Sequence, residues 1–187
     1  EIFRVNLTSG NREATVFSRL LELAPTGIVF DPASNGLVMS SFIGSRISRI
    51  TDGGIPPTLL TELSGVHGLA CGPCPGGDCL YAAQPSSEKI FRGPASGGSP
   101  TPFITGLASP VDVALGPGGA FGSYLYVTDA GRGEVRRYNT ADGTQVDAAA
   151  FVSGMQAPFG LDFHPNGSAL FVSDYKTGTI VRILPHP

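Results

Sequence analysis

The chain has 187 residues, enough to bury a core as a single domain. Its 26 glycines, 16 prolines and 14% charged residues are typical of a turn-rich all-β protein. The formal net charge of −3 gives no electrostatic reason to expect nucleic acid or an anionic membrane as a partner. No apolar run approaches the length of a membrane span, and no signal peptide is visible.

A unit of about 44 residues recurs along the chain. The first segment of each copy ends at a proline, and successive prolines lie 41, 44 and 48 residues apart: Pro32, Pro73, Pro117 and Pro165. Such intervals are typical of four-stranded propeller blades.

Each copy predicts four short strands, here called A to D. Apolar residues alternate with others in the first segment, which indicates strand A. After a turn rich in Gly, Asn, Pro and Asp, strand B reads LVMSS, LYAAQ, LYVTD or LFVSD. Strand C carries an apolar residue two positions before an arginine that we interpret as structural: Arg4, Arg49, Arg92, Arg137 and Arg182. Strand D is predicted over 15–20, 58–63, 101–107 and 148–155.

These copies predict an all-β fold, a β-propeller of four-stranded antiparallel blades, with about four blades present as a segment of a six-bladed ring. The single domain over 1–187 divides into a partial blade (1–20), blades 25–63, 66–107 and 110–155, and a partial blade (158–184). A closed four-bladed ring, in which the strand at 14–20 completes the last blade, is the alternative.

Three cysteines form a C-x2-C-x4-C cluster in one A–B hairpin: Cys71, Cys74 and Cys79. Three interpretations are open: a cross-hairpin disulfide with one cysteine left over, free thiols, or a zinc site with His67. We favour the disulfide because Cys71 shares the buried column of Phe30, Leu115 and Phe163, while His67 lies at the far end of strand A. A disulfide implies an oxidising compartment, so we expect an extracellular or periplasmic protein.

A functional site should lie where the starts of strands A and the ends of strands B converge, at the mouth of the central channel. The candidate ligand-binding residues there are Thr26, Phe42, His67, Asp112, Phe159 and Tyr175. His67 beside Asp112 would suit a metal site or a general base. The structural alternatives are that Asp112 caps a turn where other copies have glycine, that His67 is a partly exposed polar residue, and that the aromatic residues pack against neighbouring loops. Asp129 and Asp174 end two B strands, and we expect them to bind loop amides after strand B.

The units P-x-G-[IL], P-x-G, L-[YF]-V-[ST]-D and G-x-[IV]-x-R cover residues 1–184 and resemble NHL-repeat propellers and the gluconolactonase/luciferin-regenerating-enzyme-like family of six-bladed propellers. The resemblance implies a divalent cation, commonly calcium, held just before the glycine that opens strand A. Thr26, His67, Val111 and Phe159 occupy those positions, and none is a carboxylate or carboxamide, whereas calcium prefers oxygen ligands. His67 at this position resembles instead the propeller lyases, which place histidines around the channel.

We therefore predict a non-catalytic propeller that binds a small molecule or a protein partner at the channel mouth, with neither nucleic acid nor a membrane as partner. The alternative is a lactonase-type hydrolase or propeller lyase with a channel-bound divalent metal, calcium or zinc, to which His67 and Asp112 contribute. Three or more convergent polar side chains at the mouth would favour the enzyme, and an apolar mouth would favour binding.

Overall fold

The computed structural model describes residues 2–5, 14–18, 24–50 and 58–185. The strands of blade I are β3 (Pro25–Asp31), β4 (Gly36–Ser41), β5 (Arg46–Ile50) and β6 (Thr58–Thr61); those of blade II are β7 (Leu69–Cys74), β8 (Gly77–Gln84), β9 (Lys89–Pro94) and β10 (Thr101–Ile104). Blade III contains β11 (Pro110–Leu115), β12 (Leu125–Asp129) and β13 (Glu134–Tyr138), and blade IV contains β14 (Pro158–Phe163), β15 (Leu170–Asp174) and β16 (Thr179–Ile183). A separate hairpin pairs β1 (Ile2–Val5) with β2 (Ala14–Ser18). The helical content of the described residues is two 3₁₀ turns, η1 (Pro85–Ser87) and η2 (Gly119–Phe121), and neither is long or apolar enough to cross a membrane.

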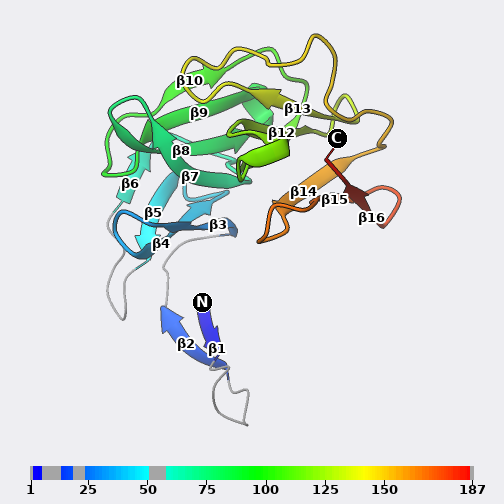
Figure 1. Ribbon diagram of the computed structural model, residues 1–187. Helices are drawn as coiled ribbons and strands as arrows, with labels where there is room; N and C mark the ends of the chain where they lie inside the picture. Colours follow the sequence, from blue (N-terminus) through cyan, green and yellow to red (C-terminus); the bar gives the residue numbers. More distant parts are fainter. Residues whose placement is uncertain (1, 6–13, 19–23, 51–57, 186–187) are drawn as a thin grey trace.

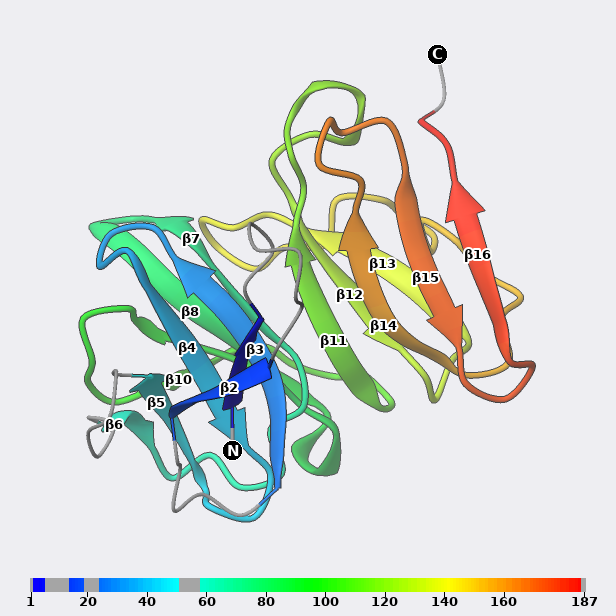
Figure 2. The ribbon, with the colours of Figure 1, turned by 90° about the horizontal axis from the view of Figure 1, so that it is seen from below.

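The prediction of an all-β partial propeller of about four blades is confirmed. Each sheet is antiparallel and runs in sequence order. The first strand of each sheet lines the central groove, so the later strands follow outward. Consecutive blades pack through these inner strands, β3 on β7, β7 on β11 and β11 on β14. Figures 1 and 2 show the four sheets fanned side by side in this order.

Three hydrophobic clusters hold the fan together, one at each interface between consecutive blades. Side chains alternate between the two faces of a strand, so each inner blade offers one apolar face to the blade before it and one to the blade after it. Between blades I and II the cluster includes Val38, Ile47 and Leu80. The next two clusters centre on the buried rings of Tyr81 and Tyr126.

The predicted fourth strand of blade III, over 148–155, is wrong. Strand β13 forms only an isolated bridge there, between Val135 and Val152. The preceding loop is held by side chains instead, because Arg137 pairs with Asp147, and Gln145 Nε2 donates to the carbonyls of Asp147 (2.6 Å) and Ala149 (3.3 Å). The backbone of this segment meets β13 only at isolated points, at the bridge between Tyr138 and Gln145, through the bond from Val146 N to Arg137 O at 2.9 Å, and at Val152.

The blades form an open arc, and the closed four-bladed ring is not what the structure shows. Among the described strands, β2 pairs with β1 alone and blade IV has no fourth strand. Figure 1 shows the β1–β2 hairpin apart from β16. Ile28 on β3 and Ile180 on β16 are 55% and 74% exposed, so the outer faces of the two end blades are uncovered.

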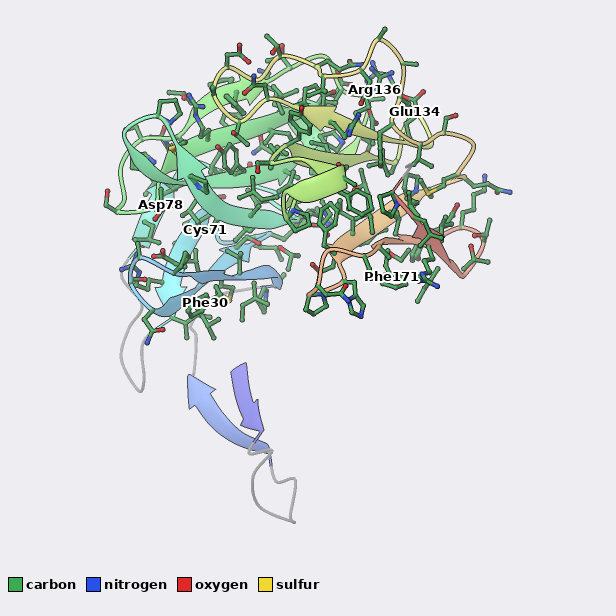
Figure 3. The ribbon with its side chains drawn as sticks, viewed as in Figure 1. Phe30, Cys71, Asp78, Glu134, Arg136 and Phe171 are labelled. Atoms are coloured by element: carbon green, nitrogen blue, oxygen red, sulfur yellow. A yellow bond between two sulfur atoms is a disulfide. The ribbon has the colours of Figure 1, made fainter. Side chains whose placement is uncertain are left out.

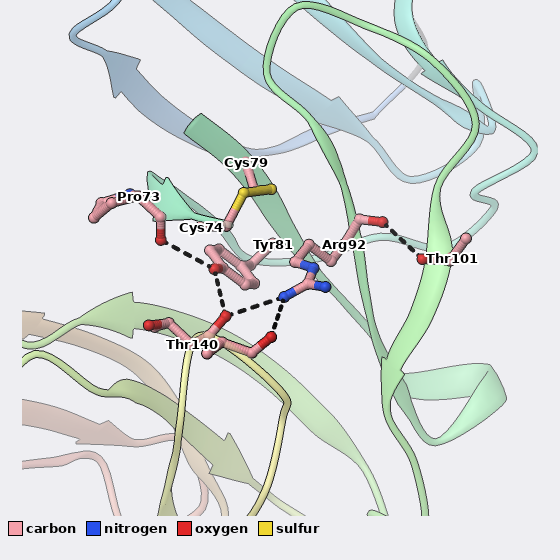
Figure 4. The surroundings of a disulfide bond; sticks show 8 residues. Pro73, Cys74, Cys79, Tyr81, Arg92, Thr101 and Thr140 are labelled. Atoms are coloured by element: carbon pink, nitrogen blue, oxygen red, sulfur yellow. Dashed lines mark hydrogen bonds between the residues drawn. A yellow bond between two sulfur atoms is a disulfide. The ribbon is translucent and has the colours of Figure 1, made fainter. Parts of the chain in front are cut away.

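A disulfide closes the hairpin at the end of blade II, as expected, and leaves one cysteine over. It joins Cys74 to Cys79, whose Cα atoms are 5.8 Å apart, and Cys71 is free. Figure 4 shows the disulfide beside Tyr81 and Arg92. The thiol and the disulfide pack into different clusters on opposite faces of the sheet, so Cys71 is not placed to exchange with the disulfide.

Candidate functional site

The inner strands of the four blades line an open groove of about 770 Å³. It takes its walls from β3, β7, β11 and β14, because these strands stand nearest the centre of the arc. Of the predicted site residues, Thr26, His67, Asp112 and Phe159 line this groove.

Phe42 and Tyr175 join this groove through a continuous row of rings at its mouth. The ring centroids lie 5.2 Å apart for Phe42 and His67, 5.8 Å for His67 and Phe159, and 5.7 Å for Phe159 and Tyr175. We call these four residues the aromatic row. It crosses three blades, since Phe42 follows β4, His67 precedes β7, and Phe159 and Tyr175 belong to blade IV.

The repeat itself positions the two ends of the row. The residue that follows strand B donates its backbone N–H to the loop before strand A of the same blade. Phe42 N bonds to Ala24 O and Tyr175 N to Ala157 O, both at 2.9 Å. In blade III the same bond is made by Ala130, which offers no ring, so the aromatic side chains are particular to blades I and IV.

His67 lies edge-on between Phe42 and Phe159, and no hydrogen bond among the described residues reaches its ring nitrogens. Burial in this apolar setting lowers the pKa of the imidazole, because desolvation disfavours its charged form. His67 is therefore neutral at neutral pH and belongs chemically to the aromatic row.

Asp112 lies within β11, where it links two inner strands. Its Oδ1 accepts the N–H of Val113 at 2.9 Å, and its Oδ2 accepts the N–H of Leu161, in blade IV, at 3.0 Å. No hydrogen bond among the described residues joins it to His67. Burial raises the pKa of this carboxyl to about 6, and the two amide bonds oppose that rise only in part.

Because the pKa of Asp112 is raised, we expect the free energy of unfolding to depend on pH. The folded-state pKa of Asp112 lies above its ordinary value of 3.8, so the folded chain favours the protonated form. Its contribution to stability is fully present below about pH 4 and is lost as the pH rises through about 6, on the order of 3 kcal/mol in all. Chemical denaturation between pH 4 and 7 should show this decline in the wild type. Asp112→Asn should lack that part of the slope, and an unchanged slope would contradict the assignment.

A calcium ion does not fit the four positions at which the family resemblance places its ligands. Val111 is buried, Phe159 and His67 offer rings, and only Thr26 carries a side-chain oxygen. The Thr26 hydroxyl already donates to Val66 O at 2.6 Å. Nor does the described part of the chain contain a group of three or more His, Cys, Asp or Glu side chains arranged to hold a metal.

Asp129 and Asp174 anchor the loops that precede strands A. Asp129 accepts the N–H groups of Ala108 and Ser109 at 2.9 and 2.8 Å and pairs with Arg132 at 2.8 Å. Asp174 accepts the amides of four residues: Gln156, Ala157, Lys176 and Thr177. The prediction of bonds to amides after strand B therefore holds for Asp174 and is wrong for Asp129.

The strand A column that includes Phe30 and Cys71 is not the buried column that the alternation indicated. Phe30, Cys71, Leu115 and Phe163 line the groove, Phe30 is exposed and Cys71 is half-buried. Cys71, Leu115 and Phe163 are half-buried because they pack against the cluster shared with the preceding blade. Phe30 is exposed because no described blade packs on that face of blade I.

The comparisons with known proteins concern the fold. Neither a protein-family profile nor a curated protein sequence matches the chain. The crystal structure of a nidogen/laminin complex matches 98% of this chain and 67% of its own, with a TM-score of 0.79 at 24% identity. A gluconolactonase from Xanthomonas campestris matches 89% of this chain and 60% of its own, with a TM-score of 0.70 at 20% identity.

This chain has a β-propeller fold. The propeller also resembles virginiamycin B lyase from Staphylococcus aureus, a catalytically inactive form of which matches with a TM-score of 0.64 at 19% identity, over 87% of this chain and 56% of the lyase. At these identities the structural neighbours show the fold of the chain and nothing beyond it. The chain spans between 56% and 67% of the length of these three structures.

Proposed function

We propose that this propeller segment is non-catalytic and binds a small molecule or a protein partner at its channel mouth. The observation that carries the proposal is the aromatic row. Each of its four rings contacts the next, and they come from blades I, II and IV: Phe42, His67, Phe159 and Tyr175. Its outer member, Tyr175, is 79% exposed. Exposed apolar surface of this kind marks binding sites in soluble proteins.

The geometry suits binding because the rings are already in place. Aromatic side chains offer a large contact area with only two side-chain torsions to restrict. The edge contacts of His67 with Phe42 and Phe159 hold both phenyl rings in position before any partner arrives. A partner therefore spends little free energy on ordering this surface.

The alternative, a metal-dependent lactonase-type hydrolase or a lyase, depends on His67 and Asp112. Both oxygens of Asp112 are engaged by backbone amides, and the imidazole is packed between phenyl rings. This arrangement supports binding better than metal chemistry. The known structures include both enzymes and a protein–protein complex. An extracellular or periplasmic location stays part of the proposal, and the Cys74–Cys79 disulfide supports it.

Selection of binders tests the proposal directly. Peptides chosen from a phage-displayed random library, and fragments chosen by ligand-observed NMR, should bind the wild type and bind Phe159→Ala or Tyr175→Ala at least about tenfold more weakly, the equivalent of about 1.4 kcal/mol. Leu184→Ala, an exposed apolar residue outside the row, is the matched control and should bind as the wild type does. Binders that tolerate both row substitutions would contradict the proposal.

Calorimetric titration with calcium and with zinc tests the enzyme alternative. Stoichiometric uptake that is lost in His67→Ala would overturn the non-catalytic assignment and justify a screen for lactone hydrolysis. The proposal expects no uptake that depends on His67.

A further inference from the structure

The turn between β14 and β15 of blade IV carries a short sequence that the candidate site does not use. Asn166, Gly167 and Ser168 form the pattern Asn-x-Ser, which is the acceptor sequence for N-linked glycans. Asn166 and Ser168 are both exposed. The two side chains that an oligosaccharide transferase must reach are therefore accessible from solvent.

The hydrogen bonds of this turn hold the side-chain amide of Asn166 by its oxygen. Oδ1 accepts the backbone N–H of Ser168 at 2.9 Å, and His164 Nδ1 lies 2.6 Å from the same oxygen. Because Oδ1 can only accept, His164 Nδ1 is the donor in the second bond. The amide nitrogen Nδ2 has no hydrogen-bond partner among the described residues. The nitrogen that would carry a glycan is therefore free, while its amide is fixed in place.

The hydroxyl of Ser168 is free as well. Ser168 contributes its backbone N–H to the turn, and no hydrogen bond within the described ranges uses its Oγ. The acceptor sequence requires a hydroxyl two residues after the asparagine. Asn35 and Asn139 are also exposed, but leucine and alanine stand at that position after them. Asn166 is thus the one asparagine in the described part of the chain with a complete acceptor sequence.

Blade I shows that a turn of this kind stays exposed beside a following blade. With its flanking residues, the blade I turn spans 30–37, the same length as 163–170 in blade IV. Figure 3 shows Phe30, which leads into the blade I turn. Ala33 is the counterpart of Asn166, and it is exposed although blade II packs on blade I. The exposure of Asn166 therefore holds whether or not another blade follows blade IV.

The turn also lies away from the aromatic row. Phe159 stands near the start of β14, and Asn166 comes after the strand has ended at Phe163. At about 3.3 Å for each residue, the strand between them is roughly 20 Å long. A glycan on Asn166 therefore leaves the aromatic row free.

We propose that Asn166 is an acceptor for one N-linked oligosaccharide when the chain enters a secretory pathway. In the transfer, Nδ2 of Asn166 attacks the anomeric carbon of an oligosaccharide carried on a polyisoprenyl pyrophosphate. The nitrogen–carbon bond forms, the bond from that carbon to the pyrophosphate oxygen breaks, and its electron pair leaves with the polyisoprenyl pyrophosphate. One amide hydrogen is lost as a proton. The inference rests on the extracellular of the two locations proposed above and does not depend on the aromatic row.

Secretion of the full chain from cultured mammalian cells, behind a supplied cleavable leader, tests this proposal. Digestion with peptide-N-glycosidase in heavy-oxygen water should leave, at the position of Asn166, an aspartate that carries the heavy isotope, detected by peptide mass spectrometry. A digest without the glycosidase measures spontaneous deamidation, to which Asn-Gly sequences are prone. Asn35, exposed but without the hydroxyl, is the internal control and should stay unlabelled. Asn6 begins a second acceptor sequence outside the described residues, so the label is read peptide by peptide.

Two variants separate the acceptor chemistry from the fold. Ser168→Ala removes the hydroxyl and keeps the backbone N–H that holds Asn166 Oδ1, so the variant should fold as the wild type does and lose the glycan. Ser168→Thr keeps a hydroxyl at the same position and should keep the glycan. Circular dichroism will verify the fold of both variants.

The outcomes at Asn166 decide the proposal. A secreted wild type in which Asn166 is unoccupied overturns it, and so does a protein that is glycosylated at Asn6 alone. A glycan that persists at Asn166 in Ser168→Ala also overturns it, since attachment would then not depend on the acceptor sequence. The supplied leader makes these results independent of the natural location, and none of them bears on ligand binding by the aromatic row.

Discussion

Replacing Gly68 with alanine should lower the free energy of unfolding by more than about 3 kcal/mol, or prevent folding altogether. Gly68 stands where β7 meets β11, and its N–H bonds to Val111 O. A Cβ added there would lie 2.6 Å from the Cα of Asp112, a backbone atom that cannot move without moving the strand. The same clash would displace the Asp112 carboxylate from the N–H of Leu161.

Gly160 provides the matched control, because it occupies the same column in blade IV. The nearest atom to an added Cβ there is Ser173 Oγ at 3.4 Å, an ordinary contact. Gly160→Ala should therefore unfold in urea near the wild-type midpoint, while Gly68→Ala unfolds far below it. Equal midpoints for the two variants would contradict the close approach of β7 and β11.

Asp129→Ala should cost about 3 to 5 kcal/mol of stability, because two backbone amides lose a buried carboxylate acceptor. The carboxylate is 0% exposed. Its loss would leave the N–H groups of Ala108 and Ser109 without their acceptor, while the exposed guanidinium of Arg132 would keep its bond to Gly106 O. A buried donor that loses its partner pays its full desolvation penalty.

Asp129→Asn keeps one acceptor oxygen, so its midpoint in urea should lie between those of the wild type and Asp129→Ala. Asp142 offers a contrast, since it also accepts a backbone amide, from Thr144, but on an exposed loop. Asp142→Ala should leave the midpoint close to that of the wild type. If Asp129→Ala behaved in the same way, the loop before β11 would not depend on this carboxylate.

Most strands could be predicted from sequence because their signals are local. Alternating apolar residues and the turns between them predicted strands A, B and C of each blade. The prediction of a fourth strand in blade III failed because local alternation does not reveal the side-chain bonds of Arg137 and Gln145, which hold a loop that meets β13 only at isolated bridges. A strand at the outer edge of a sheet has one neighbour, so a few side-chain bonds suffice to replace it.

The candidate site could be located from sequence, but its organisation could not. The register of the repeat placed Phe42, His67, Phe159 and Tyr175 at one mouth. The register could not show that His67 packs against two rings, because the three residues belong to different blades. Phe42 comes from blade I and Phe159 from blade IV, whereas His67 belongs to blade II. For the same reason Asp112 could be read as a partner of His67, while in the structure it accepts amides of two inner strands.

The sequence by itself determined the repeat, the all-β class, the propeller architecture and the face on which a site would lie, because each follows from periodicity within a single unit. Only the tertiary structure decided the open arc, the pairing of Cys74 with Cys79, the exposure of Phe30 and the joining of four rings into one row. Those features depend on the angle at which one blade packs on the next. That angle is set by contacts between residues about 30 to 50 positions apart, such as Thr128 with Phe159 and Asp112 with Leu161, which no local pattern records.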